Sequence, residues 1–247
     1  MGRNLVVGDV HGMYGRLISV LSSAGFNPAE DVLYAVGDFC DRGPEPMKVL
    51  DYLMGLPHFL PVVGNHDMWL YEYLCGRGPS STWLDPRNGG TVTYNAVKDL
   101  DSGKKTEIKQ WFGSFPLLRV YGDSIILHAG PPCGVKDEKT LLRITDGMTL
   151  EKAYKTKCFI GSYMSFVKDI VWNRDYIRTA MRNEAEPDED DLMLSFETDK
   201  TVICGHTPLK KAFHSDAFHI TCIDTGSFVP EGHITVMDLD SGEMFES

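Results

Sequence analysis

The sequence lacks any long apolar run, and none approaches the roughly 20 apolar residues that a membrane-spanning helix needs. Its first residues also lack the basic stretch and apolar core of a secretory signal peptide. We therefore expect a cytoplasmic protein with no membrane partner. Basic residues are also fewer than acidic residues. The resulting formal net charge of −11 argues against binding to a nucleic-acid duplex, whose phosphates attract basic surfaces.

Cysteine is sparse and scattered, and no two cysteines form a CxxC pair. The six are Cys40, Cys75, Cys133, Cys158, Cys204 and Cys222. This spacing supports neither a disulfide framework nor a structural zinc site, so free thiols in a reducing compartment are expected. No GxSxG is present, and no cysteine stands in a phosphate-cradling loop with a following arginine. A covalent nucleophile is therefore not indicated, and Cys40 is expected to be a packing residue.

The 247 residues and an apolar fraction of 43% are sufficient for one large domain, residues 1–247, with a full hydrophobic core. Short apolar runs alternate with segments of helical spacing, which is typical of an α/β architecture. The strands expected from these runs are 4–7, 32–36, 59–63, 201–204, 219–223 and 233–239. Residues 131–170 lack strand alternation and predict a helical and irregular insert. The acidic run 184–191 predicts a solvated loop, and 238–242 a hairpin turn.

Five apolar runs each end in a small group of residues of the types that bind metals. In order they are LVV-GDVHG, LYAV-GDFCDRG, FLPVV-GNHD, IIL-HAG and TVI-CGHT. In open α/β sheets, ligands bind beyond the carboxyl ends of the strands, so these five groups should converge on one crevice. The candidate metal ligands are Asp9, His11, Asp38, Asn65, His128 and His206.

This ligand set contains carboxylates, imidazoles and an amide oxygen but no thiolate, which suits Mn²⁺, with Fe or Zn as alternatives. Six protein ligands are too many for one ion that must keep an open position. They fit two divalent ions that share a bridging carboxylate, an arrangement that activates water and holds the oxygens of a phosphoryl group.

The motifs resemble those of calcineurin-like metallophosphoesterases of the phosphoprotein phosphatase family, whose pattern is GDxHG, GDxxDRG, GNH(D/E), HAG and GHT. The resemblance covers nearly the whole chain and, within the family, is strongest to the bacterial and bacteriophage serine/threonine phosphatases. Beyond the metal motifs, it includes Trp83-Leu84, Asn88-Gly89-Gly90, IVWNR at 170–174, GHTPL at 205–209 and IDTG at 223–226.

The resemblance implies a calcineurin-like α/β sandwich, in which two mixed β-sheets pack face to face, helices lie outside and metals bind at one edge. It also implies how the candidate ligands divide between the ions. Asp9 and His11 would hold the first ion and Asp38 would bridge the two. The second ion would be held by Asn65, His128 and His206.

Four further residues take catalytic roles by the same resemblance. His66 would protonate the leaving alkoxide, while Asp41 keeps its imidazole oriented and protonated. Arg42 and Arg174 would clamp the phosphate, for which a guanidinium fork is well shaped. On its own, Arg174 would be better interpreted as a surface arginine that follows a buried Trp172, and only the resemblance favours the clamp.

The expected reaction is hydrolysis of phosphate monoesters, with phosphoserine or phosphothreonine in proteins or peptides as substrate. Attack would come directly from a metal-bridging hydroxide, without a phosphoenzyme. Two departures, GNHD in place of GNHE and Val63 in place of arginine, are similar to diadenosine tetraphosphate hydrolases, whereas Asp41 favours a protein phosphatase. A dinucleoside polyphosphate hydrolase is therefore the alternative. An inactive binding module is disfavoured because every ligand position is filled.

Overall fold

The computed structural model describes residues 2–156, 161–188, 190 and 196–247. Its strands form two five-stranded sheets, ordered β10-β9-β1-β2-β3 and β4-β5-β6-β8-β7. The first sheet contains β1 (Asn4–Val7), β2 (Val32–Ala35), β3 (Phe59–Pro61), β9 (Thr235–Asp238) and β10 (Met244–Glu246). The second contains β4 (Leu118–Tyr121), β5 (Ser124–Leu127), β6 (Thr201–Cys204), β7 (Phe213–Ser215) and β8 (Ile220–Cys222).

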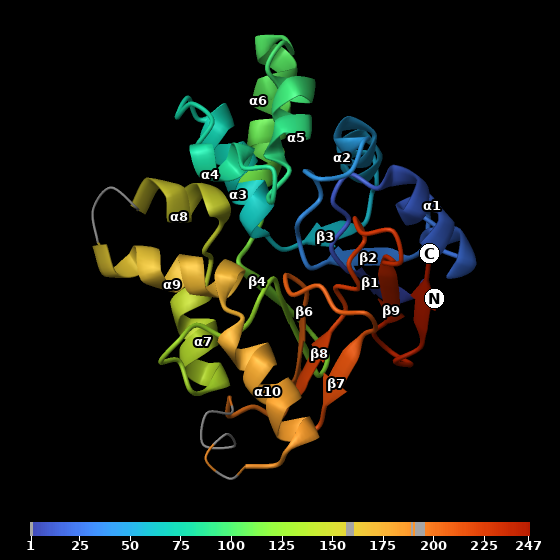
Figure 1. The fold of residues 1–247 in the computed structure, drawn as a ribbon, viewed down its shortest axis with the longest axis vertical. Helices are drawn as coiled ribbons and strands as arrows, with labels where there is room; N and C mark the ends of the chain where they lie inside the picture. The colour runs from blue at the N-terminus through green and yellow to red at the C-terminus, as the bar shows by residue number, and fades with distance from the viewer. Residues whose placement is uncertain (1, 157–160, 189, 191–195) are drawn as a thin grey trace.

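Both sheets are mixed. The strands β1, β2 and β3 run parallel, and β9 and β10 complete the first sheet in antiparallel pairs. In the second sheet β5, β6 and β8 are parallel, and β4 and β7 are antiparallel edges. The predicted calcineurin-like architecture of two mixed sheets flanked by helices is confirmed (Figure 1).

Successive side chains of a strand point to opposite faces, and this alternation builds two cores. Val6, Ile126 and Ile203 from β1, β5 and β6 belong to one buried cluster between the sheets. The neighbours of Val6, which are Leu5 and Val7, belong to the larger cluster formed with the helices. Each central strand is therefore apolar on both sides, which explains the continuous apolar runs in the sequence.

The helices fall into groups on the outside of the sandwich (Figure 1). One group contains α1 (Tyr14–Ser23) and α2 (Pro46–Met54). A second contains α3 (Asn65–Leu74), α4 (Ser81–Leu84), α5 (Gly90–Val97) and α6 (Ser102–Gly113). A third contains α7 (Glu138–Thr145), α8 (Leu150–Thr156), α9 (Gly161–Trp172) and α10 (Asp175–Ala185). The first and last strands, β1 and β10, pair with opposite sides of β9.

The predicted strands are all present, with ends that differ slightly. The strand predicted over 32–36 ends at Ala35, and the one predicted over 59–63 ends at Pro61. After β2, Gly37 takes a φ of 104° and turns the chain out of the sheet toward the ligands that follow. The hairpin turn between β9 and β10 is confirmed as well, because the Asp238 carboxylate accepts the backbone N–H groups of Asp240 and Ser241.

The insert predicted at 131–170 includes α7, α8 and most of α9, whereas 157–160 lie outside the described residues. The loop predicted at 184–191 is wrong for its first two residues, Glu184 and Ala185, which are the last of α10. The buried face of α10 continues to Asn183, and Ser215 donates a hydrogen bond to Glu184, so the helix extends into the acidic run. Residues 186–188 are exposed, and 189 and 191 are not described.

The five cysteines in the described part of the chain are free thiols, as predicted; Cys158 lies outside it. Within the same part, no helix combines the length and the apolar character needed to cross a membrane.

Candidate active site

The predicted metal ligands meet at one edge of the sandwich, where the parallel strands end. Asp9 and His11 follow β1, Asp38 follows β2, His128 follows β5 and His206 follows β6. Asn65 is the first residue of α3, which follows β3. All six are at most 5% exposed.

The carboxylate of Asp38 is the common member of two clusters that could hold metal ions. In the first cluster, Asp38 Oδ2 lies 3.6 Å from His11 Nε2 and 4.0 Å from His66 Nε2. His11 Nε2 is also 3.8 Å from Asp9 Oδ2, so the Asp9 carboxylate lies beside this cluster without being one of its three members. The cluster includes His66, which sequence reasoning had placed only in an acid pair.

The second cluster joins Asp38 to His128 and His206. His128 Nε2 lies 3.4 Å from Asp38 Oδ2 and 2.9 Å from the amide oxygen of Asn65. His206 is held close by its backbone N–H, which lies 3.2 Å from both carboxylate oxygens of Asp9. The structure therefore brings together all six ligands named from the sequence.

Backbone carbonyl groups fix the orientation of two of the imidazoles. His11 Nδ1 lies 3.0 Å from the carbonyl oxygen of Cys40, and His128 Nδ1 lies 2.7 Å from that of Val36. A carbonyl oxygen only accepts, so Nδ1 carries the proton and Nε2 presents a lone pair to the centre. Metal-binding histidines are typically oriented in this way.

The electrostatics of this centre fit bound cations. Burial, and then the nearby carboxylates of Asp224 and Asp38, raise the pKa of Asp9 well above its usual value. Burial is also the main reason why the pKa values of His11 and His206 fall well below the usual value, which leaves both rings neutral. His206 Nε2 is buried without a hydrogen-bond partner among the described residues. Neutral imidazoles beside crowded carboxylates are the donor set that divalent ions require.

His66 and Asp41 form the pair expected of a general acid and its partner. His66 Nδ1 lies 2.6 Å from Asp41 Oδ2, and the same oxygen accepts the indole N–H of Trp83 at 2.8 Å. Thr93 fixes the backbone of Asp41 by accepting its N–H. Because Nδ1 is bound to Asp41, Nε2 is the atom of His66 that faces Asp38 and the metal clusters.

The two arginines predicted to clamp a phosphate both reach this centre. The guanidinium of Arg42 contacts His11 Nε2, and that of Arg174 donates to the backbone oxygen of His206 at 3.2 Å. Burial, and then the charges of neighbouring arginines that include Arg42, lower the pKa of Arg174. Convergent guanidinium groups that repel one another favour a bound anion between them.

Trp172, expected to be buried, is 37% exposed, because its ring lies at the surface of the site. It stands edge-on to His206 with ring centroids 5.5 Å apart, and to Trp69 at 5.1 Å. Trp69 in turn lies 4.9 Å from His66. Trp69 and Trp172 therefore form a continuous row of aromatic contacts from His66 to His206.

Backbone strain is concentrated here. Six non-glycine residues in the described part of the chain have positive φ, and five of them are His11, Asp38, Asp41, Arg42 and His206. Each such conformation costs about 1–3 kcal/mol and persists only when surrounding contacts enforce it. The strain turns side chains from separate loops toward one centre.

Asp67 is a functional residue whose role sequence reasoning missed, although GNHD contained it. Its carboxylate is fully buried and accepts the backbone N–H groups of Asp38, Phe39 and Gly64 at 2.9–3.1 Å. Burial and the Asp38 charge raise its pKa to about 7. Asp67 therefore ties the loop after β2 to the start of α3 and does not face substrate.

This position predicts that Asp67→Asn lowers the free energy of unfolding by about 1–3 kcal/mol, because an amide leaves a buried N–H unpaired. The melting temperature should fall by roughly 2–4 °C per kcal/mol. Asp67→Glu keeps both acceptor oxygens and is the matched control. The ratio of activities on nucleotide and peptide substrates should be the same for Asp67→Glu as for the wild type. A changed ratio would show that the last residue of GNHD determines substrate choice.

Asp224, in the IDTG motif, was also missed as a site residue. It follows β8 and is buried, and its Oδ2 has no hydrogen-bond partner in the described part of the chain. Burial, together with the charge of Asp38, raises its pKa to about 6. Asp224 follows a parallel strand of the second sheet, as His128 and His206 do, and this position in the sequence could have identified it.

Cys40 stands beside this centre without sharing its chemistry. Its thiol is fully buried, and burial and the adjacent Asp41 carboxylate raise its pKa well above the usual value. A thiol that resists ionisation is a poor nucleophile. Packing is therefore the reading that the structure supports.

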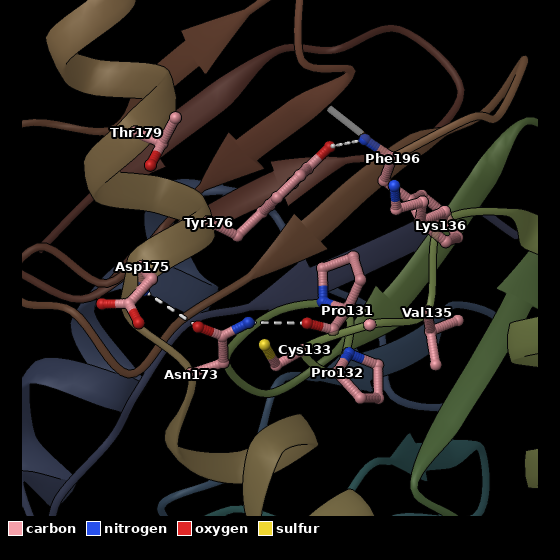
Figure 2. Close-up of a pocket in the computed structure, with 11 residues that line it drawn as sticks. Pro131, Pro132, Cys133, Val135, Lys136, Asn173, Asp175, Tyr176, Thr179 and Phe196 are labelled. Carbon is pink, nitrogen blue, oxygen red and sulfur yellow. Dashed lines mark hydrogen bonds between the residues drawn. The ribbon is translucent and has the colours of Figure 1, made fainter. Parts of the chain in front are cut away.

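Asn173 connects the loop after His128 to the start of α10, beside a cavity of about 200 Å³ (Figure 2). Its amide nitrogen donates to the Pro131 carbonyl at 2.6 Å, and its amide oxygen accepts the Asp175 N–H at 2.9 Å. These bonds fix the backbone on either side of Arg174. The cavity itself is lined mainly by apolar side chains and contains none of the predicted site residues.

A model of the calcineurin-like phosphoesterase family matches residues 2–226. A symmetrical bis(5'-nucleosyl)-tetraphosphatase of Coxiella burnetii is 31% identical over 170 residues, which are 68% of this chain and 53% of the relative. The chain thus spans about half the length of the curated relatives it matches.

Solved structures share the fold at lower identity. A cold-active protein-tyrosine phosphatase of a Shewanella species aligns with a TM-score of 0.61 and 17% identity, covering all of this chain and 80% of the other. A serine/threonine phosphatase of Saccharomyces cerevisiae aligns with a TM-score of 0.59 and 14% identity, covering all of this chain and 80% of the other. At these identities the likeness concerns the fold alone.

Proposed function

Because the chain belongs to the calcineurin-like phosphoesterase family, we propose that it hydrolyses phosphate esters or anhydrides at a centre of two divalent metal ions, with Mn²⁺ as the expected pair. The observation that carries the proposal is the carboxylate of Asp38, which belongs to two clusters of ligands at once. When bound, two such ions lower the pKa of water and neutralise phosphate charge. The six ligands named from the sequence would hold them.

The remaining residues act on the substrate. Arg42 and Arg174 bind the phosphate oxygens, since both guanidinium groups reach the centre from opposite clusters. His66 gives a proton from Nε2 to the leaving oxygen, and Asp41 holds the imidazole in the tautomer that allows it. Proton transfer depends on the buried pair of His66 and Asp41, which are hydrogen-bonded before substrate arrives.

For the substrate class we propose dinucleoside polyphosphates, the alternative of the sequence analysis in place of phosphoproteins. The proposal is supported by the symmetrical bis(5'-nucleosyl)-tetraphosphatases, which are 31–32% identical to this chain. Since the chain matches only about half of each of them, their substrate is carried over as a proposal.

A phosphoprotein substrate is the second candidate, favoured by one observation. The buried pair of His66 and Asp41 is suited to protonating a strongly basic leaving group, and a serine alkoxide is far more basic than a nucleotide phosphate. Hydrolysis of either substrate is compatible with this pair, but only the phosphoserine substrate, with its strongly basic leaving group, requires it.

Turnover of diadenosine tetraphosphate and of a phosphoserine peptide, compared in the presence of Mn²⁺, tests the choice. We expect kcat/KM to favour the dinucleotide by at least about tenfold, equivalent to about 1.4 kcal/mol of transition-state stabilisation. ADP should be the sole nucleotide product, and chelation should abolish the reaction. Turnover of the peptide alone would reverse the assignment, and turnover of neither would indicate a binding module.

A further inference from the structure

Arg16 makes an unusual set of contacts outside both metal clusters. It lies on α1, and within the described part of the chain its guanidinium donates hydrogen bonds only to backbone carbonyl groups of one loop, residues 226–232 (the 226–232 loop). The acceptors are the carbonyl oxygens of Ser227, Val229, Pro230 and Gly232, at 2.5–3.0 Å. A guanidinium presents its donors in a rigid planar fork, so one side chain fixes the whole loop.

The 226–232 loop carries Phe228 to the metal centre. The ring of Phe228 lies 4.1 Å from the Cζ atom of Arg42, in a cation–π contact. It also stands edge-on to the ring of His11, with centroids 5.2 Å apart. The loop leaves the second sheet through Asp224, so it bridges α1 and the centre.

Phe228 contributes one of the contacts that hold the Arg42 guanidinium, beside that with His11. The Nε of Arg42 has no hydrogen-bond partner among the described residues, and its φ of 64° is strained. Its guanidinium contacts His11, a group that the proposed function assigns to metal. The aromatic face of Phe228 is therefore a contact that helps to direct this side chain.

We propose that Arg16 is a positioning residue for phosphate binding. It fixes the 226–232 loop so that Phe228 holds the Arg42 guanidinium toward the substrate phosphate. The inference rests on the proposed function, since it presumes that Arg42 binds phosphate. The orientation of Arg42 would then depend on Arg16, a side chain whose hydrogen bonds go to the loop and not to the candidate metal ligands.

The test is Arg16→Gln, assayed with p-nitrophenyl phosphate in Mn²⁺. We expect kcat/KM to fall about 10–100-fold, the scale of a misplacement of about 1 Å. The inhibition constant of inorganic phosphate should rise about tenfold while the metal content is unchanged. Arg16→Lys should recover part of the loss, and Phe228→Leu, which leaves the loop contacts in place, should reproduce it.

Arg3→Gln is the matched control. Arg3 donates to the carbonyl groups of Ala24 and Gly25 just beyond the other end of α1, so its loss should affect stability without changing phosphate inhibition. In an Arg42→Ala background, Arg16→Gln should have no further effect on kcat/KM. An equal further loss there would overturn the inference. So would a fully active Arg16→Gln beside an impaired Arg42→Ala, whereas a wild type without metal-dependent hydrolysis would overturn the proposed function.

Discussion

Asp9→Asn is expected to slow phosphate hydrolysis by roughly 10³-fold and, without metal, to make the folded chain more stable. The rate falls because the centre loses a candidate metal-binding carboxylate, which lies 3.8 Å from His11 beside the first cluster. Stability rises because ionised Asp9 is unfavourable where it stands. Burial, and then the charges of Asp224 and Asp38, raise its pKa well above the usual value.

The sign of the pH dependence follows from that raised pKa. Above the unfolded pKa of about 3.9, the folded state holds the Asp9 proton more tightly than the unfolded state. The free energy of unfolding therefore falls as the pH rises from there toward the folded pKa. Asparagine cannot titrate, so this part of the decline should be absent from the variant when both proteins are unfolded by urea in EDTA.

Excess Mn²⁺ should reverse the order of the two proteins. Ions that bind only the folded state stabilise it by mass action, and the wild type should gain more than Asp9→Asn. Asp31→Asn is a matched control, because Asp31 is a buried carboxylate whose pKa is lowered by hydrogen bonds that outweigh burial. It should lose stability in EDTA and keep full activity. An Asp9→Asn protein less stable than the wild type in EDTA would contradict the electrostatic account.

The convergence of the candidate ligands could be predicted from the sequence because each follows a strand whose apolar run is easy to recognise. His128 follows β5 directly, and His206 stands two residues beyond β6, so adjacency along the chain predicts adjacency in space. Asp38 could be located for the same reason. The pairing of His66 with Asp41 came instead from resemblance, since nothing in the spacing of these residues shows their contact.

Other features depend on contacts between distant segments and leave no local pattern. Asp67 is adjacent to His66 in sequence, yet two of its three partners are backbone N–H groups of a different loop. Arg16 meets a loop more than 200 residues away, and a lone arginine on a helix gives no signal of that. The positive φ of Arg42 follows from the contacts around it rather than from its residue type. Sequence therefore predicted which groups meet at the centre better than which groups hold them in place.

His66→Asn is expected to slow hydrolysis of a phosphoserine peptide by about 10²–10⁴-fold, the usual contribution of a general acid. Asparagine cannot deliver a proton from the position of Nε2, and a departing alkoxide needs one. Against p-nitrophenyl phosphate or diadenosine tetraphosphate the loss should be less than about tenfold, because these leaving groups are weak bases. The loss should thus grow with the basicity of the leaving group.

Metal analysis must accompany these rates, because His66 Nε2 also lies 4.0 Å from Asp38 within the first cluster. If His66 is a general acid, His66→Asn should retain both ions. If His66 is a metal ligand, the variant should lose one ion and should lose the same factor in rate on every substrate. Asp41→Asn should show the same dependence on the leaving group in milder form, since Asp41 orients the imidazole at 2.6 Å. Trp83→Phe removes the second donor to Asp41 and part of a buried ring, so it should lower stability but change the rates little. Equal losses on good and poor leaving groups, with one ion missing, would falsify the acid role and place His66 among the metal ligands.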